Sequence, residues 1–174
     1  MIRAVFPGTF DPIHYGHIDI AHRAARLFDE VYVAVYDKPA KDLVFSPEER
    51  LAFVRKAFEG DGAIHVVGYR GLTVDLCHQL EAQVVVRGLR VFSDFEHEFR
   101  MALANYRLAP DVEVAALITR EEYTFLSSST VREIASLGGD VSSMVPPFIA
   151  EAMRARFVQL GDDYRALPFS LSHD

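Results

Sequence analysis

The chain begins with the apolar run IRAVF at residues 2–6, which is followed by PGTFDPIHYGH at residues 7–17. From Ile18 to Phe28, apolar residues then recur at helical spacing. This order predicts a β-strand, a loop with two prolines and two glycines, and an α-helix. In an α/β sheet, ligands bind where such a loop leaves the carboxyl end of a strand, so residues 7–17 form the first candidate site.

The histidines of this loop, His14 and His17, point to a phosphate-binding function. Gly16 lies between them and lets another backbone or a phosphate approach closely. We expect His17 in the first helical turn, where unpaired N–H groups and the helix dipole favour phosphate oxygens. A turn with a structural histidine is the alternative for any single residue, whereas the complete set favours function. As zinc ligands the two histidines lack a third partner.

Further strands and helices alternate along the rest of the chain. Ser46-Pro47-Glu48-Glu49 predicts a helix start with a capping box, and Ser93 to Glu96 predicts a second one, with Asp94 and Glu96 capping or facing solvent. Further strands are expected at 31–36, 64–68, 84–86 and 112–118, and further helices at 46–59, 72–80, 93–108, 129–138 and 147–157. The alternation predicts an α/β fold with a doubly wound five-stranded parallel sheet of Rossmann-like type and C-terminal helices. One domain is expected over residues 1–158, with a C-terminal tail at 159–174 where the periodicity is lost.

Composition indicates a cytoplasmic protein whose partners are neither nucleic acids nor membranes. The 174 residues carry a formal net charge of −7, and binding to a nucleic-acid backbone requires clustered cations. The single cysteine, Cys77, excludes an internal disulfide, fits a reducing compartment and is expected to be buried in a helix. No signal peptide is recognisable, and no run approaches the ~18 apolar residues that span a membrane.

A nucleotide would be held without the familiar glycine motifs, because the chain has neither the Walker lysine loop nor the dinucleotide fingerprint. The loops after the first, second, fourth and fifth strands open at one edge of the predicted sheet. They bring together a cationic, hydroxyl-rich cluster that suits a polyphosphate: Thr9, His14, His17, Lys41, Arg87, Arg90 and residues 127–130. Surface ion pairs are the alternative for the arginines, and simple helix capping is the alternative for the serines. No nucleophile with an activating base and no metal-ligand set is recognised.

Five motifs carry a resemblance to a known family. They are PGTFDP at 7–12, GHIDI at 16–20, RGLR at 87–90, DFExE at 94–98 and FLSSS at 125–129. The His-x-Gly-His motif and the serine-rich helix start are similar to the nucleotidyltransferase superfamily, which includes class I aminoacyl-tRNA synthetases. RGLR together with DFExE resembles the bacterial-type phosphopantetheine adenylyltransferases, over residues 1 to about 157. His14 replaces the threonine that is common in this family, and His97 stands where some members carry tyrosine.

The resemblance implies transfer of the adenylyl group of ATP to 4′-phosphopantetheine, giving dephospho-coenzyme A and pyrophosphate in coenzyme A biosynthesis. It also implies Mg²⁺ that accompanies ATP, and a homohexamer. The expected catalytic residues are His17, Lys41 and Arg90. Expected contacts to phosphopantetheine are Thr9, Lys41, Thr73 and Arg87. Expected contacts to ATP are Thr9, Phe10, His17, Gly88, Leu89, Arg90, Glu98, Tyr123, Thr124, Phe125, Leu126, Ser127, Ser128 and Ser129.

The chemistry of such a transfer agrees with the residues at hand. The acceptor phosphate is already a nucleophile at neutral pH, so positioning and fixed donors suffice. We expect His17 to donate to the α-phosphate, Lys41 and Arg87 to screen the acceptor phosphate, and the hydroxyls of 127–129 to hold pyrophosphate. Rival functions are a sister enzyme for nicotinate mononucleotide or a phosphorylated alcohol, and a non-catalytic nucleotide-binding subunit. An RNA-binding fragment is disfavoured by the acidic charge.

Overall fold

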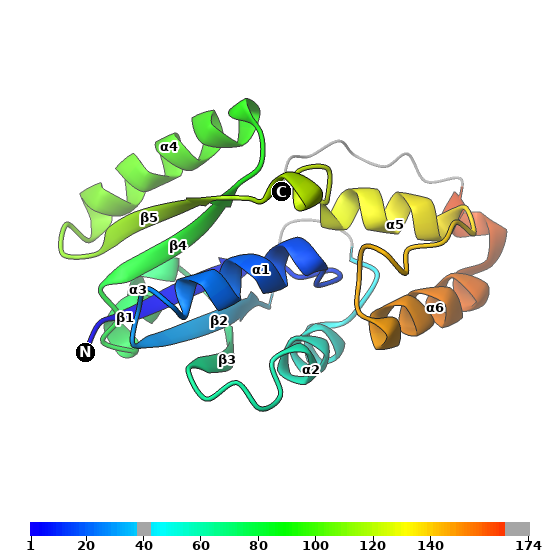
Figure 1. Ribbon diagram of the computed structural model, residues 1–174, viewed down its shortest axis with the longest axis horizontal. Coiled ribbons are helices and arrows are strands. Elements are labelled where there is room, and N and C mark those ends of the chain that lie inside the picture. The colour runs from blue at the N-terminus through cyan, green and yellow to red at the C-terminus, as the bar shows by residue number, and fades with distance from the viewer. Residues whose placement is uncertain (38–42, 166–174) are drawn as a thin grey trace.

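The computed structural model describes residues 1–37 and 43–165. Its centre is a five-stranded, all-parallel sheet with the strand order β3-β2-β1-β4-β5 (Figure 1). The strands are β1 (Arg3–Gly8), β2 (Glu30–Tyr36), β3 (Ile64–Tyr69), β4 (Val84–Leu89) and β5 (Glu113–Ile118). The predicted doubly wound α/β fold is therefore confirmed, and β1 lies in the middle of the sheet.

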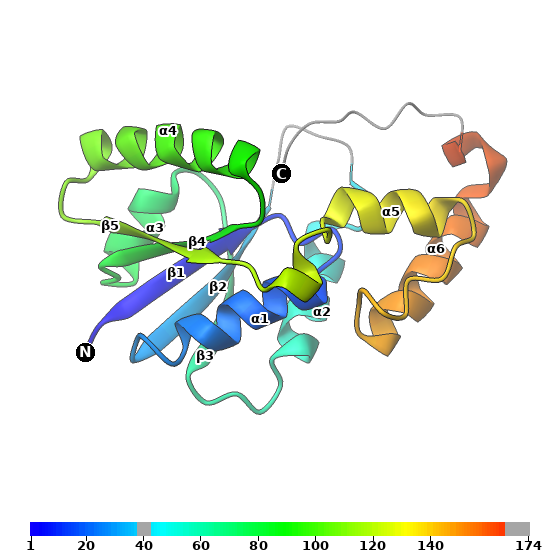
Figure 2. The same ribbon diagram turned by 45° about the horizontal axis from the view of Figure 1, so that its top comes forward.

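Helices cover both faces of the sheet (Figure 2). Helices α1 (Tyr15–Ala24) and α2 (Pro47–Ala57) lie on one face, and α3 (Thr73–Gln79) and α4 (Phe92–Leu108) lie on the other. A 3₁₀ turn η1 (Glu121–Tyr123) leads from β5 to α5 (Ser128–Ser136), which packs against α6 (Pro147–Arg165). Both α5 and α6 lie beyond the carboxyl ends of the strands, next to the edge of the sheet where the site is found.

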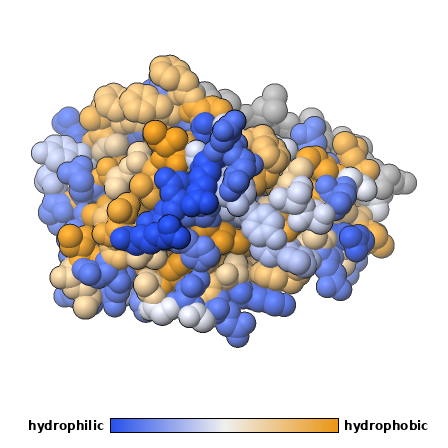
Figure 3. Space-filling view, viewed as in Figure 1, coloured by the Kyte–Doolittle hydropathy of each residue, from blue (hydrophilic) through white to orange (hydrophobic). Residues whose placement is uncertain are grey.

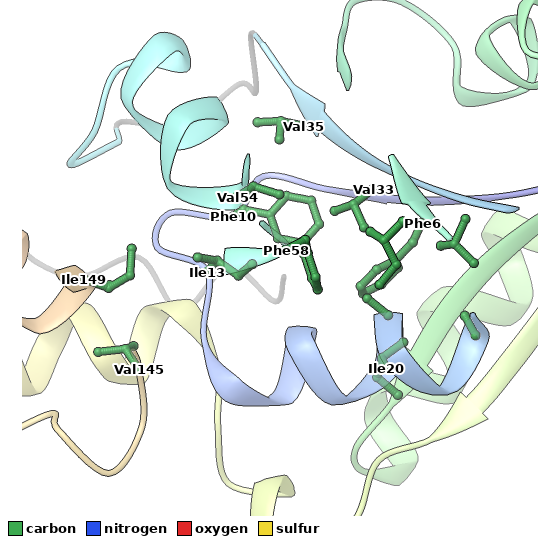
Figure 4. Close-up of a cluster of buried hydrophobic side chains, with 14 of the residues drawn as sticks. Phe6, Phe10, Ile13, Ile20, Val33, Val35, Val54, Phe58, Val145 and Ile149 are labelled. Atoms are coloured by element: carbon green, nitrogen blue, oxygen red, sulfur yellow. The ribbon is translucent and has the colours of Figure 1, made fainter. Parts of the chain in front are cut away.

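The core consists of two layers that follow the alternation of side chains along each strand. Ala4 and Phe6 of β1 belong to the layer that includes residues of α1 and α2, whereas Val5 belongs to the layer that includes residues of α3. Figure 4 shows the first layer, with Phe6 beside Val33 and α1. The predicted burial of Cys77 is confirmed in this second layer, and burial raises the pKa of its thiol to about 11. No helix within the described residues is long and apolar enough to cross a membrane.

Local sequence signals explain the start of α2 but not that of α4. The capping box of α2 is confirmed, because Ser46 Oγ accepts from the N–H of Glu49 and the Glu49 carboxylate accepts from that of Ser46. The second predicted capping box is wrong, because α4 begins at Phe92 after an N-cap residue, Val91, that makes no side-chain cap. The carboxylate of Asp94 is buried and turns back to the end of β4 instead.

Two boundaries differ from the sequence expectation. Strand β4 continues to Leu89 because its pairing with β5 runs without interruption from Val84 to Leu89, so Arg87 and Gly88 lie inside the strand. Helix α6 stays helical across residue 158 and breaks at Gly161, where φ is 63° and ψ is −161°. From residue 166 onward the predicted tail lies outside the described residues.

Candidate active site

A cleft of about 290 Å³ opens at the carboxyl edge of β1 and β4. Most of the predicted site residues line it: Thr9, Phe10, His14, His17, Thr73, Arg87, Gly88, Arg90, Glu98, Tyr123, Leu126, Ser127 and Ser128. Leu89, Thr124, Phe125 and Ser129 are not among its lining residues, and Phe125 is 58% exposed to solvent. Lys41 lies outside the described residues. The topology thus brings segments from both halves of the sheet to one cavity.

The two histidines cap the first turn of α1 reciprocally. His14 is the N-cap residue, and its Nδ1 accepts a hydrogen bond from the N–H of His17 at 3.3 Å. In return, His17 Nδ1 accepts from the N–H of His14, also at 3.3 Å. A neutral imidazole has one N–H, so an acceptor at Nδ1 requires the proton on Nε2. Both rings therefore carry Nε2–H, and the His17 side chain lines the cleft.

Aromatic packing fixes the His17 ring from two sides. The His14 ring stacks on it with centroids 3.6 Å apart, and the Phe10 ring meets it edge-on at 5.0 Å. Phe10 has a φ of 53°, in the left-handed region that residues with a Cβ rarely adopt. Gly8 makes room for the Phe10 ring, since a Cβ on Gly8 would lie 2.9 Å from Phe10 Cζ. Backbone strain at Phe10 is thus coupled to the placement of His17.

Burial keeps His14 uncharged. Its side chain is nearly inaccessible to solvent, and this burial lowers its pKa well below the usual value of 6.5. Proximity to His17 and Arg90 lowers the pKa of His14 further, because the Arg90 guanidinium repels a positive charge there and the two stacked rings could not both be charged without repulsion. A proton on His14 Nδ1 would also remove the acceptor for the N–H of His17.

The cationic cluster expected from the sequence is already neutralised within the described residues. Arg87 donates from Nε and Nη2 to Glu98 of α4, at 2.7 and 2.6 Å. Arg90 donates from Nε to Asp94 at 3.0 Å, and its Nη1 donates to the carbonyl of Leu126. Burial raises the pKa of Asp94, but the hydrogen bonds from Arg90 outweigh it and leave the pKa lowered. An anionic ligand must therefore compete with Glu98 and Asp94 for the two guanidinium groups, or bind to the arginines while these pairs remain in place.

Asp11 connects three segments around the cleft, and the sequence analysis did not single it out. Its carboxylate accepts hydrogen bonds from the N–H groups of Val44 and Phe45, at 2.9 and 3.0 Å. Its carbonyl accepts from Arg132 of α5 at 2.6 Å. Burial raises the pKa of Asp11, while the two N–H groups and Arg132 oppose the shift. The motif at 7–12 contained this residue, but only the fold places its partners beside it.

A second residue missed from the sequence, Arg50, is fully buried under the same loop. Its guanidinium donates to the carbonyls of Thr9, Tyr36, Asp37 and Phe45, at 2.7 to 3.3 Å. These carbonyls belong to the end of β2 and to the segments that precede α1 and α2. Arg50 thereby ties the loop after β1, which lines the cleft, to the end of β2 and to the segment before α2. In the sequence it is one more charged residue of an amphipathic helix.

The serine run at the start of α5 has fewer spare hydroxyls than expected. Ser127 Oγ accepts from the N–H of Thr130 and pairs with its hydroxyl, whereas Ser128 Oγ donates to the carbonyl of Pro12 at 2.9 Å. Ser129 Oγ accepts from Arg132. Ser128 therefore holds the helix start against the β1–α1 loop, whereas these hydrogen bonds of Ser127 and Ser129 are made to residues of α5 itself. The donors suited to a phosphate are the backbone N–H groups at the helix start.

Two tyrosines that the sequence analysis missed form another wall of the cleft. Tyr69 donates to or accepts from Thr73 through their hydroxyls, 3.0 Å apart, and its ring lies 5.2 Å from that of Tyr36. Both tyrosines and Thr73 line the cavity. This wall is more apolar than the side formed by Arg90 and α5. The cleft thus has one amphipathic wall and one wall rich in polar groups.

Comparison with known proteins decides the family. The Cytidylyltransferase-like family matches residues 5–134, which include every segment that lines the cleft. Phosphopantetheine adenylyltransferase of Roseiflexus sp. (strain RS-1) is 50% identical over 157 residues, covering 90% of this chain and 98% of that protein. The protein of that name from Thioalkalivibrio sulfidiphilus is 51% identical over 153 residues, covering 88% and 96%. The chain belongs to the phosphopantetheine adenylyltransferase family.

The similarity to phosphopantetheine adenylyltransferases extends along nearly their whole length. The relative from Gloeobacter violaceus is 50% identical over 154 residues, which cover 88% of this chain and 96% of that adenylyltransferase. The resemblance drawn from the five motifs is therefore confirmed. In this chain the α1 cap and the cleft share a stacked imidazole pair, formed by His14 and His17.

Proposed function

We propose that the cleft transfers the adenylyl group of ATP to 4′-phosphopantetheine, the reaction that the family name describes. Dephospho-coenzyme A and pyrophosphate are the products. The observation that carries the proposal is the orientation of the His17 imidazole, which is fixed by a hydrogen bond at Nδ1, by the stacked His14 ring and by the edge-on Phe10 ring. A fixed donor of this kind stabilises charge that develops on a phosphate in the transition state.

The proposed reaction requires no general base. An oxygen of the acceptor phosphate attacks the α-phosphorus of ATP, the bond from that phosphorus to the bridging oxygen breaks, and pyrophosphate leaves with the electron pair. His17 Nε2–H donates to a non-bridging oxygen of the α-phosphate. The remaining requirement is to hold two anionic groups in line, which positioning and charge screening supply.

Phosphopantetheine is proposed to lie along the wall formed by Thr73 and the neighbouring tyrosines. Its pantetheine arm suits this amphipathic surface, and its phosphate would reach Thr9 and Arg87. Arg87 would then exchange part of its pairing with Glu98 for the phosphate, because both are bidentate partners for a guanidinium. Lys41 is proposed as a second cation for that phosphate.

ATP is proposed to occupy the other side of the cleft, between β4 and the start of α5. The backbone of Gly88 and the side chain of Arg90 would border the nucleotide, and the leaving pyrophosphate would face the first turn of α5. The proposed ATP contacts that line the cavity are Thr9, Phe10, His17, Gly88, Arg90, Glu98, Tyr123, Leu126, Ser127 and Ser128.

Mg²⁺ is proposed to accompany ATP. The acidic side chains that line the described part of the cleft are Asp11, Asp94 and Glu98, and each already accepts hydrogen bonds from N–H groups or guanidinium groups. They therefore fit a metal ion that is coordinated mainly by the phosphates of ATP and by water. Bound in this way, Mg²⁺ would neutralise charge on the departing pyrophosphate.

A homohexamer is proposed, supported by an apolar face of α4. We call this the α4 face; its members are at least 49% exposed and recur every three or four residues: Phe92, Phe95, Phe99, Leu103 and Tyr106. Phe92 is 88% exposed, and the rings of Phe92, Phe95 and Phe99 are stacked in sequence. Figure 3 shows largely apolar atoms along the upper edge, over α4. A contiguous apolar face of this kind is typical of a subunit interface.

A cytoplasmic location is proposed for the enzyme. The free thiol of Cys77 is buried in the second core layer and its pKa is raised, which suits a compartment where thiols stay reduced. The proposed substrates are small molecules, in keeping with the excess of 25 acidic over 18 basic residues.

Pyrophosphate release tests the proposed function directly. ATP and Mg²⁺ are supplied with 4′-phosphopantetheine, nicotinate mononucleotide or glycerol phosphate in separate reactions, with the His17→Ala variant as control. We expect release with 4′-phosphopantetheine alone. Release with another acceptor would contradict the substrate, whereas ATP binding without any release would favour a regulatory, non-catalytic subunit.

A further inference from the structure

The contacts around His14 assign it a task that is separate from binding a substrate. Its Nδ1 is occupied by the N–H of His17, and its ring covers one face of the His17 imidazole at a centroid distance of 3.6 Å. The backbone N–H of His14 supplies the hydrogen bond to His17 Nδ1. Two contacts to the His17 ring and one to its backbone N–H thus originate in one residue.

We propose that His14 is a positioning residue, which holds the His17 imidazole in the orientation and tautomer that present Nε2–H to the cleft. This inference rests on the proposed function, in which His17 is the donor to the α-phosphate. The stacked ring limits rotation of the His17 side chain. The cap that His14 Nδ1 makes holds the helix start, and with it the N–H that bonds to His17 Nδ1.

The space around His14 is matched to this role. Gly16 adjoins the His14 ring, and a Cβ at Gly16 would lie 3.0 Å from His14 Cε1 and 3.1 Å from its Nδ1. A residue with a Cβ at position 16 would therefore require the His14 ring to shift by a few tenths of an ångström. His14 is also only 4% exposed, so displacement of the ring would open a void in a packed region. The sequence HYGH thus encodes the ring pair and the gap that accommodates it.

Two substitutions separate positioning from direct phosphate binding. His14→Ala removes both the stacked ring and the side-chain cap. His14→Asn keeps a cap acceptor, because asparagine is a preferred N-cap residue, but it removes the ring. His22→Ala is the matched control, since His22 is a half-exposed histidine of the same helix that pairs with Asp61 and does not line the cleft. Thermal melting of each variant establishes that the chain is folded.

The first measurement is the tautomer of His17, from the ¹⁵N shifts of its ring nitrogens in the protein without substrates, assigned with the His17→Ala variant. We expect wild type to carry the proton on Nε2 and His14→Ala to show a mixture of tautomers. His14→Asn should recover most of the Nε2–H form, and His22→Ala should match wild type. An unchanged tautomer and an unchanged turnover in folded His14→Ala would overturn the proposal.

The second measurement is steady-state release of pyrophosphate. We expect His14→Ala to lower kcat by roughly tenfold to a hundredfold, the range for a misplaced reacting group, with little change in the KM for ATP. A raised KM for ATP with an unchanged kcat would instead identify His14 as a direct phosphate ligand and overturn the positioning role. If wild type releases no pyrophosphate, the proposed reaction fails, and the tautomer measurement alone decides the claim for His14.

Discussion

The carboxylate of Glu98 accepts two hydrogen bonds from the guanidinium of Arg87, at 2.7 and 2.6 Å. The two residues come from neighbouring elements, since Arg87 lies within β4 and Glu98 within α4. A third donor of the same guanidinium binds the carbonyl of Pro7 at 3.1 Å. Arg87 is therefore fully oriented before any substrate arrives, and a phosphate at this point would meet a preformed guanidinium.

Arg87→Ala should weaken binding of 4′-phosphopantetheine. Loss of a charge-assisted hydrogen bond costs roughly 1.5–3 kcal/mol, so we expect its KM to rise on the order of tenfold or more. Steady-state kinetics with each substrate varied in turn measures this. Arg100→Ala is the control, because it removes an Arg–Glu pair that is exposed on α4. If the KM for ATP rose instead, Arg87 would belong to the nucleotide side.

His17→Ala should lower turnover far more than binding. Removing one donor to a developing oxyanion costs about 10²–10³ in kcat, and we expect a loss of this size for pyrophosphate release. Calorimetric titration of ATP into the variant should give a Kd close to that of wild type. Weakened ATP binding with intact turnover would exclude the proposed role of His17 in the transition state.

Arg50→Met should destabilise the fold and lower activity only as a consequence. The substitution leaves four carbonyl groups beneath the cleft without their donor, and breaking a buried charged network costs roughly 3–5 kcal/mol of unfolding free energy. Urea unfolding measures the loss. Arg55→Ala, on the exposed side of the same helix, should change stability by less than about 0.5 kcal/mol. Similar effects of the two substitutions would refute the structural role of Arg50.

His14→Asn should make stability less sensitive to acid. The pKa of His14 lies well below 6.5 in the folded protein, so below that pH the unfolded chain binds a proton that the folded chain does not. Wild type should therefore lose up to about 1.4 kcal/mol per pH unit relative to the variant as the pH falls below 6.5. Urea unfolding at pH 7.5, 6.5 and 5.5 isolates this difference, because the other histidines are common to both proteins. Parallel pH profiles would mean that His14 is not held neutral.

Phe95→Glu should dissociate the proposed homohexamer. A carboxylate in the middle of the α4 face would have to be desolvated in an interface, and it interrupts the stack of Phe92, Phe95 and Phe99. Light scattering after size-exclusion chromatography should show a smaller species. Leu27→Glu, at another exposed apolar residue, is the control and should leave the mass unchanged. An unchanged mass for Phe95→Glu would place the interface elsewhere.

The fold could be predicted because its signals are local. Apolar runs, the capping box at Ser46 and the loop at 7–17 each act over a few residues, and together they predicted the parallel α/β sheet. The predicted start of α4 was wrong because another local contact, between Arg90 and Asp94, takes the place of the cap. Asp94 is of a residue type that often caps helices and stands near the expected helix start, but its carboxylate accepts hydrogen bonds from Arg90 at the end of β4.

The candidate site could be predicted only in outline. Motifs predicted many of the residues that line the cleft, whereas the pairing of its charges depends on contacts across the sheet and helices. The partner of Arg87 lies 11 residues away in the chain, and the burial of Arg50 leaves no trace in helical periodicity. The hydroxyl of Ser128 seemed free in sequence because Pro12 comes close to it only in three dimensions.

The bonds that close the cleft join the two ends of the domain. Ser128 reaches the carbonyl of Pro12 across 116 positions, and Arg132 reaches that of Asp11 across 121 positions. Such distant pairings form late in folding, because their loop-closure entropy must be overcome first. During synthesis, the β1–α1 loop is among the first segments to emerge, but the helix α5 that forms the opposite side of the cleft emerges more than 100 residues later. A nascent or partly unfolded chain therefore cannot assemble a nucleotide site, which confines adenylyl transfer to completed domains.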